Sequence, residues 1–271
     1  MFSIIMPLYQ VHPDLVNEAI SSVFNQTYTD WELIVVDATS VDWEHYQRLT
    51  AVYDSFGITP LRQTGRGVSQ ARNQGVIASQ GDYLAFLDGD DWWYPTYLEE
   101  VDLAYPEADV TVTKGDCHRV LKSVQTGKHD KWPIWVNHHE LIEDYADLNH
   151  MLWFMYRRPL WLSGITLKKT LFSPFIESLN LWEDTEFLLH LFSKRPRTEI
   201  ISDSLWYYRI HDNSSTGFIS SQTPGDLDEI ADLEGRKVVV EKYFSEECPS
   251  DLPSELFEWS MFRINGGEWN V

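Results

Sequence analysis

The 271-residue sequence has only two cysteines, no long apolar run and few basic residues. Two cysteines without a Cys-x-x-Cys pair are too few for a disulfide framework, which favours a reducing compartment. No stretch approaches the roughly 18 apolar residues of a membrane-spanning helix, and the first ten residues lack the pattern of a signal peptide. We therefore expect a cytoplasmic protein with no transmembrane segment.

Basic residues number 21 against 42 acidic ones, which gives a formal net charge of −21. Binding to nucleic acid or to an anionic membrane requires a basic surface, so we expect neither. Residues 1–110 contain 17 acids and four arginines but no lysine. If this half binds a phosphorylated ligand, a divalent metal would have to help neutralise the phosphates.

Glycine and proline are also few, at 14 and 12 residues, which excludes a collagen-like or low-complexity chain. The hydrophobic content of 43%, with 12 Trp, 13 Tyr and 13 Phe, excludes disorder as the main state. The sequence is therefore that of a globular protein with a packed core.

The first third of the chain alternates short apolar runs with segments of helical periodicity. The predicted strands are Phe2–Met6, Trp31–Val36, Ile58–Arg62 and Tyr83–Leu87; the predicted helices begin at Pro13, Trp43 and Val68. This order indicates an α/β fold with a parallel sheet and helices on both faces. Ligands of such sheets bind beyond the carboxyl ends of the strands, where the residues after Met6, Val36 and Leu87 should meet in one crevice.

Beyond about residue 115 the pattern is mixed. Helical periodicity covers His138–Asp147, Glu183–Phe192 and Asp226–Phe244, and strand patterns cover Thr198–Ile201 and Leu205–Ile210. We interpret the chain as one compact domain with a C-terminal helical appendage.

Asp88, Asp90 and Asp91 follow the fourth predicted strand and form the first candidate site. Their charges repel one another, and hard oxygen ligands suit Mn²⁺ or Mg²⁺ bound to a diphosphate. The alternative is an ordinary acidic turn, but the position at a strand end favours a metal site.

Two further motifs follow in the second half. Glu183 and Asp184 precede an amphipathic helix, where a carboxylate could be a general base or only a helix cap. His211 leaves a strand pattern and enters a polar turn, where it could complete a metal site or serve as an ordinary hydrogen-bonding residue. The segment Gly65–Asn73 carries Arg66 and Arg72 from a loop into a helix start, a favourable place for an anion.

Together these motifs resemble the family-2 glycosyltransferases, which have the GT-A fold. The resemblance covers about residues 2–216. It rests on the segments Ser3–Tyr9, Ala19–Val23, Asn25–Tyr28, Leu33–Asp37, Ala71–Gly75, Gly81–Tyr83, Leu87–Trp92, Glu183–Phe187 and Tyr208–His211. It implies a single Rossmann-like GT-A domain, 1–216, with a mostly parallel central sheet flanked by helices. Residues 1–115 would be the nucleotide-binding half, 116–216 the acceptor-binding half and 217–271 a helical extension.

The resemblance also implies roles for individual residues. The nucleotide-binding residues would be Pro7, Tyr9, Asp37, Arg66, Arg72, Asp88 and Gly89; the metal ligands would be Asp90, His211 and Asp88, holding Mn²⁺ or Mg²⁺. Asp184 would be the catalytic base, supported by Glu183, and Trp92 and Trp182 could contact the acceptor. The family usually has Asp-Asp-Gly-Ser after the second strand, whereas this chain has Asp37-Ala38-Thr39-Ser40, which leaves the donor nucleotide less defined.

The implied function is inverting transfer of a sugar from a nucleotide sugar, a UDP-sugar first of all, to a hydroxyl of a saccharide or related acceptor. A homodimer is a possible assembly. Two other functions stay open. A sugar-phosphate nucleotidyltransferase would need a Gly-rich basic loop, and residues 7–14 contain no Gly, Lys or Arg. A non-catalytic carbohydrate-binding or scaffold protein would use the tryptophans without needing the acidic motifs.

Overall fold

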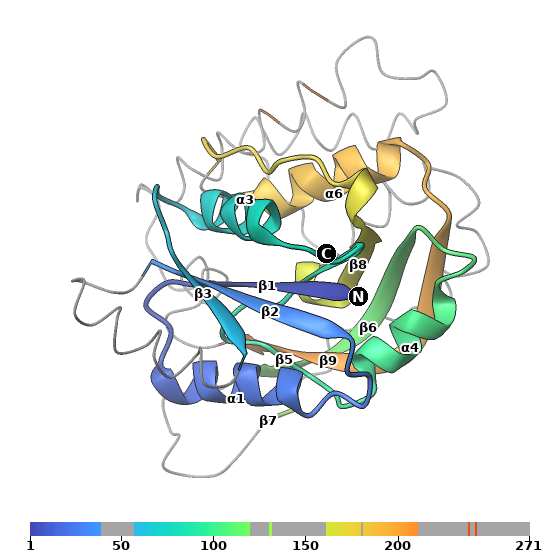
Figure 1. The fold of residues 1–271 in the computed structure, drawn as a ribbon, viewed down its shortest axis with the longest axis horizontal. Coiled ribbons are helices and arrows are strands. Elements are labelled where there is room, and N and C mark those ends of the chain that lie inside the picture. The colour runs from blue at the N-terminus through green and yellow to red at the C-terminus, as the bar shows by residue number, and fades with distance from the viewer. Residues whose placement is uncertain are drawn as a thin grey trace, which may run out of the picture.

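The computed structural model describes residues 1–38, 57–119, 130–131, 161–179 and 181–210, together with Val238 and Lys242. Within these residues a single nine-stranded sheet has the order β3-β2-β1-β4-β8-β6-β9-β5, and β7 pairs with β6 (Figure 1). The strands are β1 (Phe2–Leu8), β2 (Trp31–Asp37), β3 (Ile58–Arg62), β4 (Tyr83–Phe86), β5 (Trp92–Trp93), β6 (Val110–Arg119), β7 (Asp130–Lys131), β8 (Ile165–Lys168) and β9 (Thr198–Ile210). The helices are α1 (Pro13–Phe24), α3 (Val68–Ala78), α4 (Tyr97–Ala104) and α6 (Glu183–Ser193), with short 3-10 turns at Leu162–Gly164 and Lys169–Leu171.

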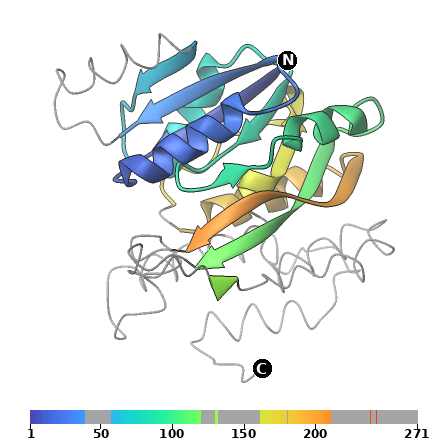
Figure 2. The same ribbon diagram turned by 90° about the horizontal axis from the view of Figure 1, so that it is seen from below.

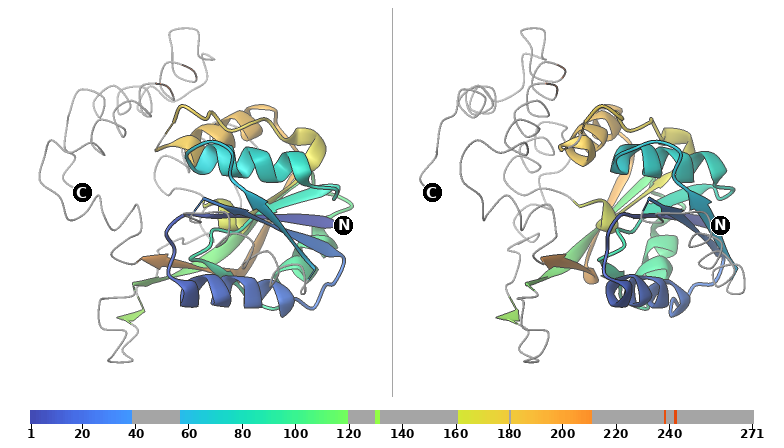
Figure 3. Two further views of the ribbon diagram at one scale, coloured as in Figure 1. Left: turned by 60° about the vertical axis from the view of Figure 1, so that its left-hand side comes forward. Right: turned by 90° about the vertical axis from the view of Figure 1, so that its left-hand side faces the viewer.

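The first half of the sheet confirms the predicted parallel arrangement, since β3, β2, β1 and β4 all run in the same direction. α3 and α6 cover one face of the sheet and α1 covers the other (Figure 3). Alternate residues of a strand point to opposite faces, so β1 contributes to two cores. Ile5 belongs to the same buried cluster as Phe187 of α6, whereas Ile4 belongs to the cluster that contains Val23 of α1. Burial on both faces explains why these strands are continuous apolar runs.

β1 extends through Pro7 to Leu8, whereas the sequence predicted that it stops at Met6. Proline has no N–H and usually interrupts a sheet. The N–H of Leu87 donates to the carbonyl of Ile5, so the backbone hydrogen-bonding groups of residue 5 point toward β4. Because this direction alternates along a strand, those of residue 7 point to the same side. Pairing with β4 has already ended at Ile5 and Phe86, so Pro7 disrupts no hydrogen bond between strands.

The second half of the sheet is mixed, because β8 is antiparallel to both neighbours while β6 and β9 are parallel (Figure 2). The two strands predicted at 198–201 and 205–210 form one continuous strand, β9. Two register shifts on either side of Lys114 in β6 leave residues of β9 without a paired residue in β6, namely Ser202, Asp203 and Leu205. Sequence analysis did not predict β5, α4, β6 or β8.

Other predictions fall partly or wholly on residues that the structure does not describe. The helices predicted at 43–53 and 138–147 lie outside the described residues, as does His211. Within the helix predicted at 226–244, only Val238 and Lys242 are described, and both have helical backbone. None of the helices in the described part of the chain is both long and apolar enough to cross a membrane.

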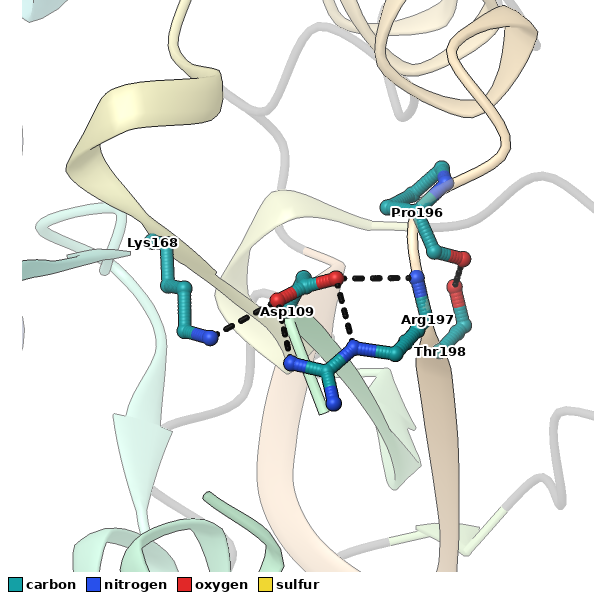
Figure 4. Close-up of polar contacts among 5 residues, drawn as sticks. All are labelled: Asp109, Lys168, Pro196, Arg197 and Thr198. Atoms are coloured by element: carbon teal, nitrogen blue, oxygen red, sulfur yellow. Dashed lines mark hydrogen bonds and ion pairs between the residues drawn. The ribbon is translucent and has the colours of Figure 1, made fainter. Parts of the chain in front are cut away.

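Asp109 connects the starts of β6 and β9 with the end of β8 through hydrogen bonds (Figure 4). Its carboxylate accepts hydrogen bonds from Lys168 Nζ over 2.7 Å and from Arg197 Nη2 and Nε over 2.9 and 3.0 Å. These bonds hold the pKa of Asp109 well below its ordinary value. The ion pairs therefore favour the charged carboxylate in the folded protein.

Asp109→Asn is expected to lower the free energy of unfolding at pH 7 by about 1 kcal/mol, since the bonds are charge-assisted but partly exposed. A lowered folded-state pKa stabilises the protein above the unfolded value of about 4, and this contribution is lost as the pH falls further. Urea unfolding between pH 7 and pH 3 should show the difference from wild type shrinking below about pH 4. The exposed Asp82→Asn serves as control, and a difference that is constant with pH would contradict the assignment.

Candidate active site

Loops from three strands meet at one edge of the sheet, as predicted. The N–H of Ala38, after β2, donates to the carbonyl of Leu8 over 2.9 Å. Gly89, after β4, lies so close to Leu8 that a Cβ at this position would overlap the Leu8 side chain. Asp37 is buried at the end of β2. The glycine in the Asp-Gly-Asp segment therefore has a packing reason that is independent of any ligand.

Arg72 of α3 lies at the centre of this edge, with a side chain that is only 5% exposed. Its Nη2 donates to Asp88 Oδ1 over 2.9 Å and its Nη1 donates to Glu183 Oε1 over 3.0 Å. Burial by itself lowers the pKa of Arg72, but the two carboxylates outweigh it and raise the pKa, so the guanidinium stays charged. Arg72 thus links the two acidic motifs that the sequence singled out separately.

The guanidinium of Arg72 also lies over the ring of Phe175, 5.5 Å from its centroid. Asn73 fixes the backbone of Phe175, because its Nδ2 donates to the Phe175 carbonyl over 3.0 Å and its Oδ1 accepts from the Phe175 N–H over 2.8 Å. Sequence analysis missed this arrangement. The only sign of it in the sequence is the amide side chain of Asn73 at the end of the Gly65–Asn73 motif, and its partner Phe175 lies 102 positions away.

The second acidic motif forms the first turn of α6. Trp182, directly before the helix, has a left-handed backbone with φ of 70°, which is strained for a bulky residue by about 1–3 kcal/mol. Glu183 is buried against Arg72, whereas Asp184 is partly exposed and accepts a hydrogen bond from the Thr185 N–H over 2.6 Å. Asp184 lies in the first turn, two positions after the N-cap residue Trp182, and no side-chain cap bond is made at this helix end. The cap role considered for Asp184 is therefore not the one observed: its bond satisfies the N–H of the next residue in the first turn. The geometry still accommodates the role of general base.

Both carboxyl groups have raised pKa values. Burial, followed by the charge of Asp184, raises the pKa of Glu183 to about 7, although Arg72 opposes this. Burial also raises the pKa of Asp184, again against the effect of Arg72. A carboxyl group that titrates above its ordinary range is better matched to general base chemistry near neutral pH than an ordinary one.

The three aspartates after β4 separate into different environments. Asp88 is about one third exposed and Asp90 is half-buried, while Asp91 is buried. The Ser163 hydroxyl donates to Asp91 Oδ2 over 2.7 Å and the Arg209 N–H donates to Oδ1 over 3.1 Å. Asp91 therefore joins the loop to β9 and to the 3-10 turn at 162–164. Burial, followed by the charges of Asp90 and Asp88, raises its pKa well above the ordinary value.

Within the described part of the chain, no group of three His, Cys, Asp or Glu side chains converges on one point. Asp88 and Asp90 contribute two carboxylates. Mg²⁺ in nucleotide sites is commonly held by one or two carboxylates together with substrate phosphates, so this donor set fits such a metal. His211 lies outside the described residues.

The remaining predicted site residues differ in their surroundings. Tyr9 is 67% exposed at the end of β1, and Arg66 is exposed on the loop before α3. Trp182 is partly buried against the core beneath α6. Trp92 is half-buried on β5 and stacks on Tyr207, with ring centroids 4.2 Å apart. Tyr9 and Arg66 are thus accessible to a ligand at the sheet edge.

Glu186, one turn along α6 from Glu183, is buried and accepts a hydrogen bond from Lys242 Nζ over 2.5 Å. The two residues are 56 positions apart. A buried carboxylate needs such a partner, because an unpaired charge in the interior is costly. A residue of the predicted C-terminal extension therefore contacts the helix that carries the second acidic motif.

Lys242→Met is expected to lower the free energy of unfolding by about 1–3 kcal/mol, because it leaves the Glu186 carboxylate without this donor. Thermal unfolding of the single variants and of Glu186→Gln with Lys242→Met forms a double-mutant cycle. The double variant should lose less than the sum of the single variants. Additive losses would mean that the two side chains do not interact.

A comparison with protein-family models matches residues 3–158 to the family described as glycosyl transferase family 2. The match covers more than half of the chain. It includes β1, the Arg72 helix and the aspartates after β4, and it ends before α6.

Curated relatives of this chain include two proteins named as glycosyltransferases. The chain is 27% identical over 231 residues to the uncharacterized glycosyltransferase EpsJ of Bacillus subtilis, covering 80% of this chain and 63% of EpsJ. It is 37% identical over 99 residues to the UDP-Glc:alpha-D-GlcNAc-diphosphoundecaprenol beta-1,3-glucosyltransferase WfgD of Escherichia coli, covering 36% of this chain and 38% of WfgD. The chain thus spans less than two thirds of the length of either relative.

Among solved structures, S. aureus TarS 1–349 in complex with UDP superposes with a TM-score of 0.65. The sequence identity is 16%, and the superposition covers 97% of this chain and 71% of that chain. At this identity the similarity is one of fold.

Proposed function

Because this chain belongs to glycosyltransferase family 2, we propose that it is a metal-dependent inverting glycosyltransferase of polysaccharide biosynthesis. It moves a sugar from a nucleotide sugar to a hydroxyl of a saccharide acceptor. The observation that carries the proposal is the position of Arg72, which pairs with Asp88 of the donor motif and Glu183 of the base motif. One buried cation thus brings the two acidic motifs to the same edge of the sheet.

At the donor end, Asp88 and Asp90 would hold Mn²⁺ or Mg²⁺ against the diphosphate. Hard carboxylate oxygens, a base-poor first half and partial exposure of both aspartates support this assignment. When bound, the metal would stabilise the negative charge of the departing diphosphate. Pro7, Tyr9, Asp37, Arg66, Arg72, Asp88 and Gly89 remain the proposed nucleotide-binding residues, and His211 remains a proposed metal ligand.

At the acceptor end, Asp184 would take the proton of the attacking hydroxyl. The hydroxyl oxygen forms a bond to the anomeric carbon as the bond from that carbon to the diphosphate breaks. Attack from the face opposite the leaving group inverts the anomeric configuration. The raised pKa of Asp184 and its partial exposure support this role, and Glu183 would hold Arg72 beside it.

A UDP-sugar is the proposed donor. The relative WfgD, 37% identical over 99 residues, is named for a UDP-Glc donor. Asp37, at the end of β2, is the residue proposed to contact the nucleotide base.

The test is release of diphosphate from a panel of nucleotide sugars, with Mn²⁺, with Mg²⁺ and with EDTA. We expect metal-dependent hydrolysis of a UDP-sugar, and we expect Asp90→Ala to abolish metal-dependent donor binding. Asp82→Ala is the matched control, because Asp82 is an exposed aspartate before β4, at the opposite edge of the sheet. Metal dependence would be refuted if wild type and Asp90→Ala both bind the donor as tightly with EDTA as with the metal ion. No binding of any nucleoside diphosphate would favour a scaffold protein instead.

A further inference from the structure

A groove of about 370 Å³ lies between α1 and the β5 segment, apart from the carboxylates that pair with Arg72. Its walls include Asn17, Glu18, Ser21 and Asn25 from α1, and Trp92 and Pro95 from the other side. The volume falls within the range of small-molecule sites in proteins. None of these residues except Trp92 has a part in the function proposed above.

The α1 wall carries three neutral hydrogen-bonding side chains beside the charged Glu18. Asn17, Ser21 and Asn25 are exposed and recur every four residues, so they share one face of the helix. The opposite wall contains the indole of Trp92, which is fixed by its stacking on Tyr207. Amides and a hydroxyl facing an aromatic ring match a ligand with many hydroxyls and an apolar ring face, which is a saccharide.

Charge argues against an anionic ligand in this groove. Glu18 is the one charged residue of its lining, and Arg209 Nη2 donates to Glu18 Oε2 over 2.5 Å. The Arg209 side chain is itself buried and already engaged in this bond. With no cation among the lining residues, the groove suits neutral sugars better than nucleotides or uronic acids.

Hydrogen bonds between the two walls make the groove rigid. The Trp93 N–H donates to Ser22 Oγ over 3.1 Å, and Gln26 Nε2 donates to the carbonyl of Tyr94 over 2.8 Å. Arg209 also connects the groove to the candidate active site, because its N–H donates to Asp91 while its side chain holds Glu18. Because such a site is already formed, little conformational entropy is lost when a ligand binds to it.

We infer that this groove is a subsite for a neutral sugar unit of the acceptor, one that does not itself react. The inference rests on the proposed function. α1 begins five residues after the carboxyl end of β1, so the Asn17 end of the groove is the end nearer the active-site edge. An acceptor chain lying in the groove would then extend toward Asp90, which precedes Trp92 by two positions.

The experiment is saturation-transfer NMR of the full chain with neutral trisaccharides, namely cellotriose, laminaritriose and chitotriose, and with trigalacturonate as an anionic counterpart. Ser21→Trp would fill the groove from the exposed face of α1, and Gln80→Trp would add the same side chain at a distant exposed position. We expect at least one neutral probe to bind wild type and Gln80→Trp, and Ser21→Trp to weaken that binding by about tenfold or more.

Release of diphosphate from the donor, measured on the same three proteins, separates this inference from the proposed function. Donor hydrolysis should be unchanged in Ser21→Trp, because the groove does not hold the donor. Binding of trigalacturonate alone, or neutral binding that Ser21→Trp leaves unchanged, would overturn the subsite. A dimer that Ser21→Trp converts to monomer would show instead that the groove is an interface between copies of the chain.

Discussion

Asp184→Asn is expected to slow single-turnover sugar transfer by about 10²–10⁴-fold while leaving the fold and donor binding intact. Asparagine has nearly the same shape, and its Oδ1 can still accept the hydrogen bond from the Thr185 N–H in the first helical turn. The amide cannot accept the proton of the acceptor hydroxyl. A single-turnover measurement at saturating donor and acceptor isolates the chemical step from binding and product release.

Glu183→Gln is the matched comparison, because Glu183 is the adjacent carboxyl group in the same helical turn. We expect a smaller loss of rate, since Glu183 pairs with Arg72 and would act through it. A hydrogen bond to a first-turn N–H contributes about 0.5–1.5 kcal/mol to stability and nothing to chemistry. Near-normal turnover of Asp184→Asn together with a lower melting temperature would therefore mean that Asp184 only stabilises the first turn of α6. A larger loss of transfer rate in Glu183→Gln than in Asp184→Asn would mean that Glu183 is the general base and Asp184 the supporting group.

Arg72→Ala is expected to have the largest effect on stability, at about 3–5 kcal/mol, because it removes one partner of a buried ion pair. Without the guanidinium, Asp88 and Glu183 lose a buried cation that lies 2.9 and 3.0 Å from them. Their repulsion should also displace both motifs, so sugar transfer should be lost in any folded fraction. Urea unfolding and donor hydrolysis measure these two effects separately.

Arg72→Lys separates charge from geometry. Lysine keeps the positive charge but cannot direct a planar fork of N–H groups at two carboxylates. We expect it to recover part of the stability and little of the transfer rate. Arg62→Ala, at an exposed arginine at the end of β3, is the control. Wild-type transfer by Arg72→Lys would show that charge alone is sufficient, and wild-type stability of Arg72→Ala would contradict the ion-pair assignment.

Several parts of the molecule follow from local sequence. The apolar runs of β1 and β2 must be buried on both faces, which requires helices on both sides of a parallel sheet. Pro13 begins α1, and helical periodicity marks α6. The position of Asp88 shortly after the apolar strand β4 placed it at the edge of the sheet that carries the candidate site. These features depend on neighbouring residues, so their patterns are visible in the sequence alone.

Tertiary structure decided which of the three aspartates after β4 lies beside Arg72. Asp88 turns toward Arg72, whereas Asp91 is buried between Ser163 and the backbone of Arg209. In sequence the two carboxylates differ by only three positions. Their separate environments depend on where β9 and the 3-10 turn at 162–164 pass the loop.

The partners of Arg72 likewise come from tertiary structure, since Asp88 and Glu183 are 16 and 111 positions away. The same holds for the pairing of Glu186 with Lys242. Sequence by itself identified β1 to β4, α1, α3, α6 and β9, and the residue types that occur where those segments end, but not β5, α4, β6 or β8. Only the order and register of the sheet decided which of those residues meet, because hydrogen bonding and burial between distant segments leave no local pattern.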